Sequence, residues 1–207
     1  MKVNVYKFDV KKMRELLFCS NNIHKTEEIR KMLPSGYRIS SLKEAGIFTD
    51  IPETGETFEE NALIKVSAVK SNNHSGCFAD DSGLCVEYLD DAPGVHSARY
   101  AGEHATDAEN RSKLLNELKG ISNRRAYFIT VICLLMDEKV YYFEGRIYGR
   151  IATEEKGFGG FGYDCIFIPD SYDKTFAEMT SDEKNKISHR YLALHKMMQF
   201  LKEKQNI

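Results

Sequence analysis

Short apolar runs alternate along this chain with segments whose apolar residues repeat at helical spacing. The first run, residues 16–19, ends at the polar residues 20–22, which favour a turn or a helix N-cap. Helical spacing follows and ends at Pro34. The pattern predicts a strand, a loop and a helix, with Lys25 in or near the first helical turn.

Two further helices are marked by a capping box, in which a threonine precedes a glutamate by three positions. Thr57 and Glu60 stand before an apolar helical face, and we expect this helix to end near residues 72–76. Thr106 and Glu109 repeat the spacing before a leucine-rich helix that should stop at Gly120.

The longest β signal covers residues 127–136 and 140–151, with a two-residue connection that predicts a hairpin. The apolar segments 77–79 and 84–86 flank four small or acidic residues. We therefore expect an interrupted strand, with Asp80 and Asp81 at a strand end. Strands and helices interleave, which predicts an α/β (mixed α+β) fold around an elongated sheet.

The C-terminal third combines a glycine-rich segment, residues 157–162, with a final helix. A short strand should follow the glycines and end at Pro169. The apolar stripe of the last helix runs from residue 187 to residue 201, and helical spacing puts His189 opposite it and Arg190 at its edge. Together with two lysines, these residues form a cationic patch at the start of that helix.

Composition narrows the class of protein. The 207 residues carry 29 basic and 31 acidic side chains, so no overall field points to a nucleic acid or an anionic membrane. No apolar stretch approaches the roughly 18 residues needed to span a bilayer. We expect one cytoplasmic domain over residues 1–207, with a charged leader at 1–15 and five reduced core cysteines.

Carboxylates gather between residues 44 and 60, where no lysine or arginine accompanies them. Oxygen ligands of this kind suit Mg²⁺, which bridges one or two carboxylates to substrate phosphates. For Glu56, Glu59 and Glu60 we favour the alternative, an acidic surface loop with an N-cap cluster. For Asp81 we favour the metal, because its flanking strand segments are apolar.

Two other segments are candidates for ligand binding. Residues 20–25 place polar donors where a strand leads into a helix N-terminus, which favours a bound anion, although such residues also cap helices without a ligand. The glycine segment can approach a ligand closely, with Phe161 or Tyr163 stacking on a base. The alternatives are a flexible turn or an RNA-binding strand, although Gly160 stands where that RNA motif has an aromatic residue.

Six segments, in this order, resemble the inosine triphosphate pyrophosphatase family, also called the Ham1-like nucleoside triphosphate pyrophosphatases. They are SNNIHK at 20–25, ETGETFEENALIK at 53–65, ADDSGL at 79–84, APGVHSARYAG at 92–102, GGFGYD at 159–164 and DEKNKISHR at 182–190. The resemblance covers nearly everything from Leu16 onward.

The resemblance implies a Mg²⁺-dependent hydrolase that cleaves deaminated purine nucleotides such as ITP, dITP and XTP between the α and β phosphates. It also implies an elongated mixed sheet with two lobes around a nucleotide cleft, and a homodimer that binds neither nucleic acid nor membrane. A pyrophosphatase with broader or standard-nucleotide specificity is the main alternative, and an RNA-binding module is the other.

By motif position, the resemblance implies that Glu53 and Asp81 hold the metal and that Asp81 accepts the proton of the attacking water. The substrate-binding residues that it implies are Ser20, Asn21, Asn22, Ile23, His24, Lys25, Lys65, Ser82, Phe161, Gly162, Tyr163, Asp164, Lys184, His189 and Arg190. Phe158 and His24 depart from the small residues expected at their positions, and the leader is longer than expected.

Overall fold

A single mixed sheet of six strands runs the length of the molecule in this computed structural model, which describes residues 13–49, 51–69 and 76–205. The order across the sheet is β2-β1-β3-β4-β5-β6. Only the β1 pairings, with β2 and β3, are parallel. The strands are β1 Arg14–Phe18, β2 Tyr37–Ser41, β3 Cys77–Val86, β4 Arg125–Met136, β5 Lys139–Ile151 and β6 Phe167–Pro169. The predicted mixed fold is confirmed.

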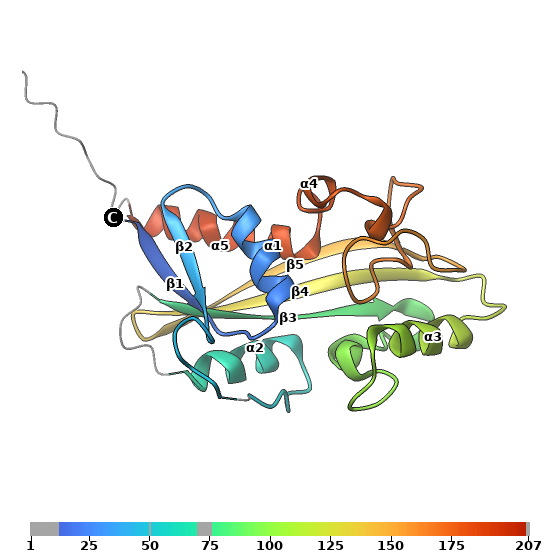
Figure 1. Ribbon diagram of the computed structural model, residues 1–207, viewed down its shortest axis with the longest axis horizontal. Coiled ribbons are helices and arrows are strands. Elements are labelled where there is room, and N and C mark those ends of the chain that lie inside the picture. The colour runs from blue at the N-terminus through green and yellow to red at the C-terminus, as the bar shows by residue number, and fades with distance from the viewer. Residues whose placement is uncertain (1–12, 50, 70–75, 206–207) are drawn as a thin grey trace, which may run out of the picture.

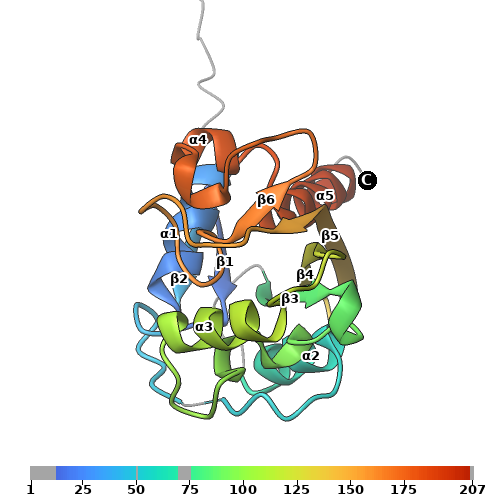
Figure 2. The same ribbon diagram turned by 90° about the vertical axis from the view of Figure 1, so that its right-hand side faces the viewer.

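Helices cover both faces of this sheet. One face carries α1 (Ile23–Met32), α4 (Ser181–Lys184) and α5 (His189–Gln205), and the opposite face carries α2 (Phe58–Ser67) and α3 (Asp107–Glu117), as Figure 1 and Figure 2 show from two directions. Three short 3₁₀ helices, Glu87–Leu89, Gly94–Arg99 and Phe176–Glu178, lie in the connections. The sheet therefore separates two layers of helices.

The predicted helix starts are confirmed. Thr57 and Thr106 each accept a hydrogen bond from the backbone three residues on, and the paired glutamate bonds back in both cases. At α1 the Asn22 side chain accepts from the Lys25 backbone. The predicted end of α2 near residues 72–76 is wrong, because the tightened bond from Val69 N–H to the Val66 carbonyl ends the helix after Ser67.

The interruption expected in the third strand is also wrong. Residues 77–86 form one continuous strand, β3, which pairs with β4 along its full length. Asp80 and Asp81 therefore lie in the middle of a strand, not at its end. Two aspartates are tolerated there because cations from opposite faces of the sheet pair with them.

The hairpin prediction is confirmed in detail. The strands β4 and β5 are joined by Asp137 and Glu138, whose φ angles of 51° and 60° are the left-handed pair that a two-residue hairpin turn requires. These long strands carry the core on both faces, and α5 packs its Leu194 and Met197 against them. The sheet supplies a rigid base for the site.

The last helix differs from the prediction at its start. It begins at His189, while Lys184 belongs to the separate short helix α4. His189 is buried instead of facing away from the core, because its ring stacks on Phe128 of β4. Arg190 is only 2% exposed. The expected cationic patch is thus mostly an interior cluster.

The remaining expectations concern the termini and the thiols. Most of the predicted leader, residues 1–12, lies outside the described residues, but Arg14 and Glu15 belong to β1. All five cysteines are described and free, and four of them are buried. Among the described residues, no helix has the length and apolar character to cross a membrane.

Candidate active site

The edge of β3 opens into a cavity of about 320 Å³. Strand β1 pairs with β3 only as far as Phe78, so the edge from Ala79 to Leu84 has no partner strand among the described pairings. Side chains cover this edge instead: Lys65 donates to the Asp80 carbonyl, and Ser97 accepts from the Leu84 backbone. Successive side chains of β3 point to opposite faces, so Asp81 and Ser82, which both line the cavity, reach it from the two sides of the strand.

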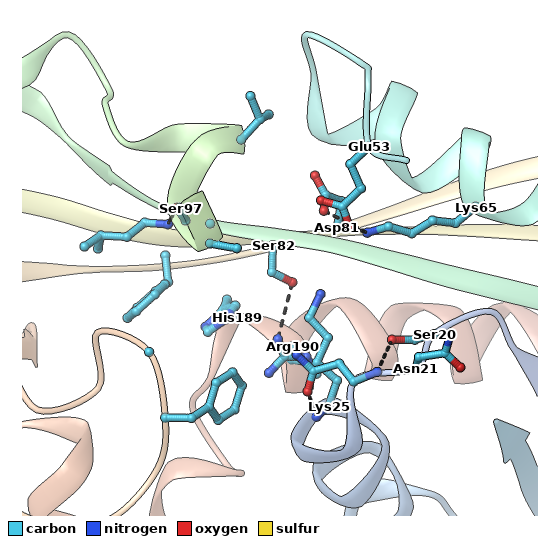
Figure 3. A pocket seen from close by; sticks show the side chains of 18 of the residues that line it. Ser20, Asn21, Lys25, Glu53, Lys65, Asp81, Ser82, Ser97, His189 and Arg190 are labelled. Carbon is cyan, nitrogen blue, oxygen red and sulfur yellow. Dashed lines mark hydrogen bonds and ion pairs between the residues drawn. The ribbon is translucent and has the colours of Figure 1, made fainter. Parts of the chain in front are cut away.

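Nearly all of the expected residues meet at this cavity, although they come from distant parts of the chain. Those that line it are Ser20, Asn21, Asn22, Lys25, Glu53, Lys65, Asp81, Ser82, Phe161, Gly162, Tyr163, Asp164, Lys184, His189 and Arg190. Ile23 and His24 do not line it. Figure 3 shows Glu53, Lys65 and Asp81 on one side of β3, with Lys25, His189 and Arg190 on the other.

On the α2 side, Lys65 joins two carboxylates. Its ammonium nitrogen Nζ lies 2.6 Å from Glu53 Oε1 and 2.9 Å from Asp81 Oδ1. Burial lowers the pKa of Lys65, but the charges of Asp81 and Glu53 outweigh it and raise the pKa above its usual value. Burial raises the pKa of Asp81, against the opposing effect of Lys65. This side holds a charged lysine and a carboxylate that is a stronger base than an exposed aspartate.

Two residues that the sequence did not single out fix this arrangement. Asn61 is fully buried, donates to Asp81 Oδ2 at 3.2 Å and accepts from the Gly55 backbone. Arg99 donates to the backbone carbonyl of Glu53 at 3.1 Å, with its second nitrogen 3.9 Å from the Glu53 carboxylate. The loop that carries Glu53 is therefore tied to α2 at one point and to the 94–99 turn at another.

On the opposite side, Asp80 binds two cations. Lys25 Nζ lies 3.0 Å from Asp80 Oδ2, and Arg190 Nε donates to the same oxygen at 3.3 Å. Burial would raise the pKa of Asp80, but Lys25 and Arg190 hold it well below its usual range. Ser82, two residues along the strand, donates to this oxygen and also contacts Arg190. Asp80 thus acts as an anchor for residues that face the cavity.

Glu28 is the second anchor, and sequence reasoning missed it. Its carboxylate binds Lys184 at 2.8 Å and also binds Arg190. Burial works against ionisation, yet Arg190 and Lys184 lower the pKa of Glu28. Asp164 binds Lys184 from the other direction at 2.7 Å. The two cations expected to contact the ligand are held from α1, β3 and the glycine segment together.

The glycine segment is shaped around Asp164. Gly160 has φ +72°, and a Cβ there would lie 2.0 Å from Asp164 Oδ2, so no other residue fits. The same oxygen accepts from the Phe161 backbone. The segment forms no strand, so the RNA-binding strand considered above is not formed. Phe158 is fully exposed and does not line the cavity.

Phe161 contacts a histidine ring and a lysine ammonium group. Its ring stacks on His24 with centroids 5.3 Å apart, and Lys184 Nζ lies 5.0 Å from its centre. Tyr163, the other candidate for base stacking, is buried and donates its hydroxyl to the Ser97 carbonyl. Phe161 is therefore the better placed ring, and Tyr163 supports the cavity wall.

His189 is a neutral donor or acceptor in the wall. Its ring stacks on Phe128 at 4.7 Å. Burial, with the charges of Arg190 and Lys184, lowers the pKa of His189 well below its usual value. Its Nδ1 has no hydrogen-bond partner among the described residues. This nitrogen is buried in a residue that lines the cavity.

A metal would have to be held by few protein ligands. Within the described residues, no group of three histidine, cysteine or acidic side chains converges on one point. Glu53 and Asp81 do converge, with the cation of Lys65 between them. Mg²⁺ commonly takes one or two carboxylates and completes its shell with water and phosphate oxygens, so this pair fits it.

The fold and the cavity define a class: an α/β protein in which one sheet edge presents paired carboxylates on one side and buried cations on the other. The chain belongs to the Ham1 family, whose model matches residues 16–200. This assignment agrees with the six sequence segments, each of which contributes residues to the cavity. Residues 92–102 do so through Val95, Ser97 and Ala98.

Relatives and solved structures cover almost the whole chain. A protein of Porphyromonas gingivalis named dITP/XTP pyrophosphatase is 50% identical over 190 residues, covering 91% of this chain and 98% of the relative. One of the same name from Flavobacterium psychrophilum is 47% identical over 188 residues, covering 91% and 99%. The structure of a HAM1 protein from Coxiella burnetii superposes with a TM-score of 0.83 at 41% identity, covering 92% of this chain and 100% of that one.

Proposed function

We propose that this protein hydrolyses deaminated purine nucleoside triphosphates, namely dITP, XTP and ITP, to the monophosphate and pyrophosphate, and so cleanses the nucleotide pool. The observation that carries the proposal is the two-sided cavity, with Glu53, Lys65 and Asp81 on one side of β3 and Lys25, Lys184 and Arg190 on the other. The dITP/XTP pyrophosphatase relatives support the choice of substrate.

Glu53 and Asp81 are the residues that would hold Mg²⁺. When bound, the metal would neutralise phosphate charge and favour ionisation of a water. Asp81 accepts the proton of the attacking water, a role that suits a carboxylate whose pKa is raised by burial. Asn61 keeps the Asp81 carboxylate oriented for this transfer.

The triphosphate lies toward the N-terminus of α1. Ser20 and Asn22 stand there, beside backbone N–H groups that favour anions. Lys25 and Lys65 supply positive charge from the two sides of β3. Both lysines are paired with aspartates, so phosphate oxygens would exchange for carboxylate oxygens at each ammonium.

The base lies near Phe161 and the start of α5. Phe161 supplies a ring for stacking, while Lys184 and Arg190 supply donors that suit a purine with oxygen at C6. The amino group of adenine would leave those donors unpaired, and such a loss can cost roughly 10⁴-fold in selectivity. Neutral His189 adds one nitrogen that can donate or accept.

The test is pyrophosphate release from XTP, dITP, ITP, GTP, ATP and dUTP, each with and without magnesium. We expect turnover of the first three, little turnover of ATP, and no turnover after chelation. Equal rates on ATP and XTP would favour a pyrophosphatase of broader specificity. No release from any nucleotide would overturn the proposal.

A homodimer and a cytoplasmic location are further predictions from the family resemblance. Light scattering on the purified protein tests the first: a mass near twice the 23.7 kDa of the chain is expected. Cell fractionation tests the second, with the protein expected in the cytosolic fraction and not with membranes.

A further inference from the structure

Lys65 sits at the point where a cation would join Glu53 and Asp81. An ammonium group has three protons, and three acceptors surround this one: Glu53 Oε1 at 2.6 Å, Asp81 Oδ1 at 2.9 Å and the Asp80 carbonyl at 2.9 Å. The side chain is 9% exposed. The lysine is thus fully coordinated by oxygen, in the way that a small metal ion would be.

The charges on this side of the cavity are balanced without a metal. Two carboxylates, Glu53 and Asp81, face two cations, Lys65 and the more distant Arg99. A divalent ion added alone would bring two uncompensated positive charges into a buried site, which is costly at low dielectric. A triphosphate, in contrast, brings enough negative charge to satisfy both the ion and the lysine.

The side chain of Lys65 can move between these partners. It extends from α2 on a flexible four-carbon stem and lines the same cavity as Ser20 and Lys25. The stem is long enough to allow the ammonium to exchange these oxygen atoms at the β3 edge for those of a phosphate in the cavity.

We propose that Lys65 is a built-in substitute for the metal. Its ammonium keeps free divalent cations out of the site until the phosphates of a nucleoside triphosphate bind it in place of the protein oxygens. The inference rests on the proposed function, because it assigns the metal to Glu53 and Asp81. Its consequence is that metal and triphosphate bind with strong mutual dependence. Free metal alone should bind weakly to the protein.

The test is equilibrium dialysis of Mn²⁺ against the full-length protein at pH 8, without nucleotide. The wild type should bind Mn²⁺ weakly, and Lys65→Met should bind it at least about 10-fold more tightly because the competing charge is gone. Lys65→Arg keeps the charge and should stay weak. Lys139→Met, at an exposed lysine at the start of β5, should match the wild type.

Two further measurements test whether the change in Mn²⁺ binding arises at this site. Adding Asp81→Asn to Lys65→Met should abolish the gained Mn²⁺ binding, because one of the two ligands is lost. Adding inorganic pyrophosphate to the wild type should raise the Mn²⁺ held by the protein at least about 10-fold at equal free Mn²⁺, since its oxygens can accept the lysine. This arm needs no variant, so it stands even where Lys65→Met fails to fold.

The inference is overturned if the wild type binds Mn²⁺ alone as tightly as it does with pyrophosphate, or if folded Lys65→Met binds no better than Lys139→Met. Its failure is distinct from failure of the proposed function. If the protein hydrolyses XTP but binds Mn²⁺ tightly without nucleotide, only the inference about Lys65 is contradicted. If the variants bind Mn²⁺ as expected but the protein releases no pyrophosphate from any nucleotide, only the proposed function is contradicted.

Discussion

Asp80 and Asp81 are neighbours in one strand and both are buried, yet their pKa values shift in opposite directions. Asp80 faces α1 and α5, where Lys25 and Arg190 form ion pairs with its carboxylate and lower its pKa. Asp81 faces α2, where it shares Lys65 with Glu53 and where burial raises the pKa of Asp81. The pleat of the strand alone separates them. Identical side chains become an anchor and a reactive carboxylate according to the face they occupy.

The largest expected effect is on catalysis at the α2 face. Asp81→Asn removes the proton acceptor and a metal ligand, so turnover of XTP should fall at least about 10³-fold. Stability should change by less than about 1 kcal/mol, because Lys65 keeps Glu53 as a partner. Pyrophosphate release and urea unfolding measure the two effects. Near-normal turnover in the folded variant would show that Asp81 is not the base.

Asp80→Asn should do the reverse and act first on stability. It leaves Lys25 without its ion-pair partner and the buried Arg190 with one carboxylate instead of two, and breaking a buried pair in this way costs about 3 kcal/mol or more. Urea unfolding at pH 7.5 provides the measurement, with Asp81→Asn as the matched control. A loss of stability that is no greater than in the control would remove the distinction between the two faces.

The next largest expected effect is the pH dependence of stability that neutral His189 causes within the charged cluster around it. Buried His189 stays uncharged below pH 6.5, where a histidine in the unfolded chain takes up a proton. Stability therefore falls as the pH drops below about 6.5, by up to about 1.4 kcal/mol per pH unit until the folded-state pKa is reached. His189→Phe, which keeps the stack on Phe128, should lose this dependence.

Urea unfolding of the wild type and of His189→Phe at pH 7.5, 6.5 and 5.5 tests this expectation. Other groups titrate equally in the two proteins, so the difference between the slopes belongs to His189. Equal slopes would mean that the histidine is charged in the folded protein.

The smallest effect is expected where an ion pair lies in solvent. Arg125 and Asp170 are 2.9 Å apart and about half exposed. Water screens such pairs, so Arg125→Gln should change stability by less than about 0.5 kcal/mol and leave XTP turnover unchanged. Thermal unfolding and pyrophosphate release provide the measurements. A larger loss would show that distance alone, and not burial, sets the strength of ion pairs in this chain.

Sequence reasoning succeeded where the cause is local. Capping boxes join residues three apart, and the hairpin turn needs only its own two residues, so both were predictable. The interruption of β3 was a wrong prediction for the opposite reason. The cations that make Asp80 and Asp81 tolerable in a strand come from Lys25, Lys65 and Arg190, and no local pattern connects them.

The site shows the same division. Residues in distinctive motifs, such as Ser20, Asp81 and Phe161, are recognisable from the sequence because their neighbours in the chain mark them. Glu28 is not, because a glutamate three positions after Lys25 is indistinguishable from an ordinary helix-surface charge. Its partners, Lys184 and Arg190, lie more than 150 positions away in the chain. Arg99 was missed for the same reason, since its contact with Glu53 forms only when the two segments pack.

The edge of β3 that lacks a partner strand also affects how the protein associates with other molecules. Unpaired backbone groups along a strand invite pairing with a second molecule, and natural proteins counter this with charge and coverage. Here the lysine that crosses the margin from α2 and the serine of the 94–99 turn occupy those groups. Substitutions that remove the side chains of Lys65 or Ser97 from this edge should therefore promote self-association as well as weaken the site.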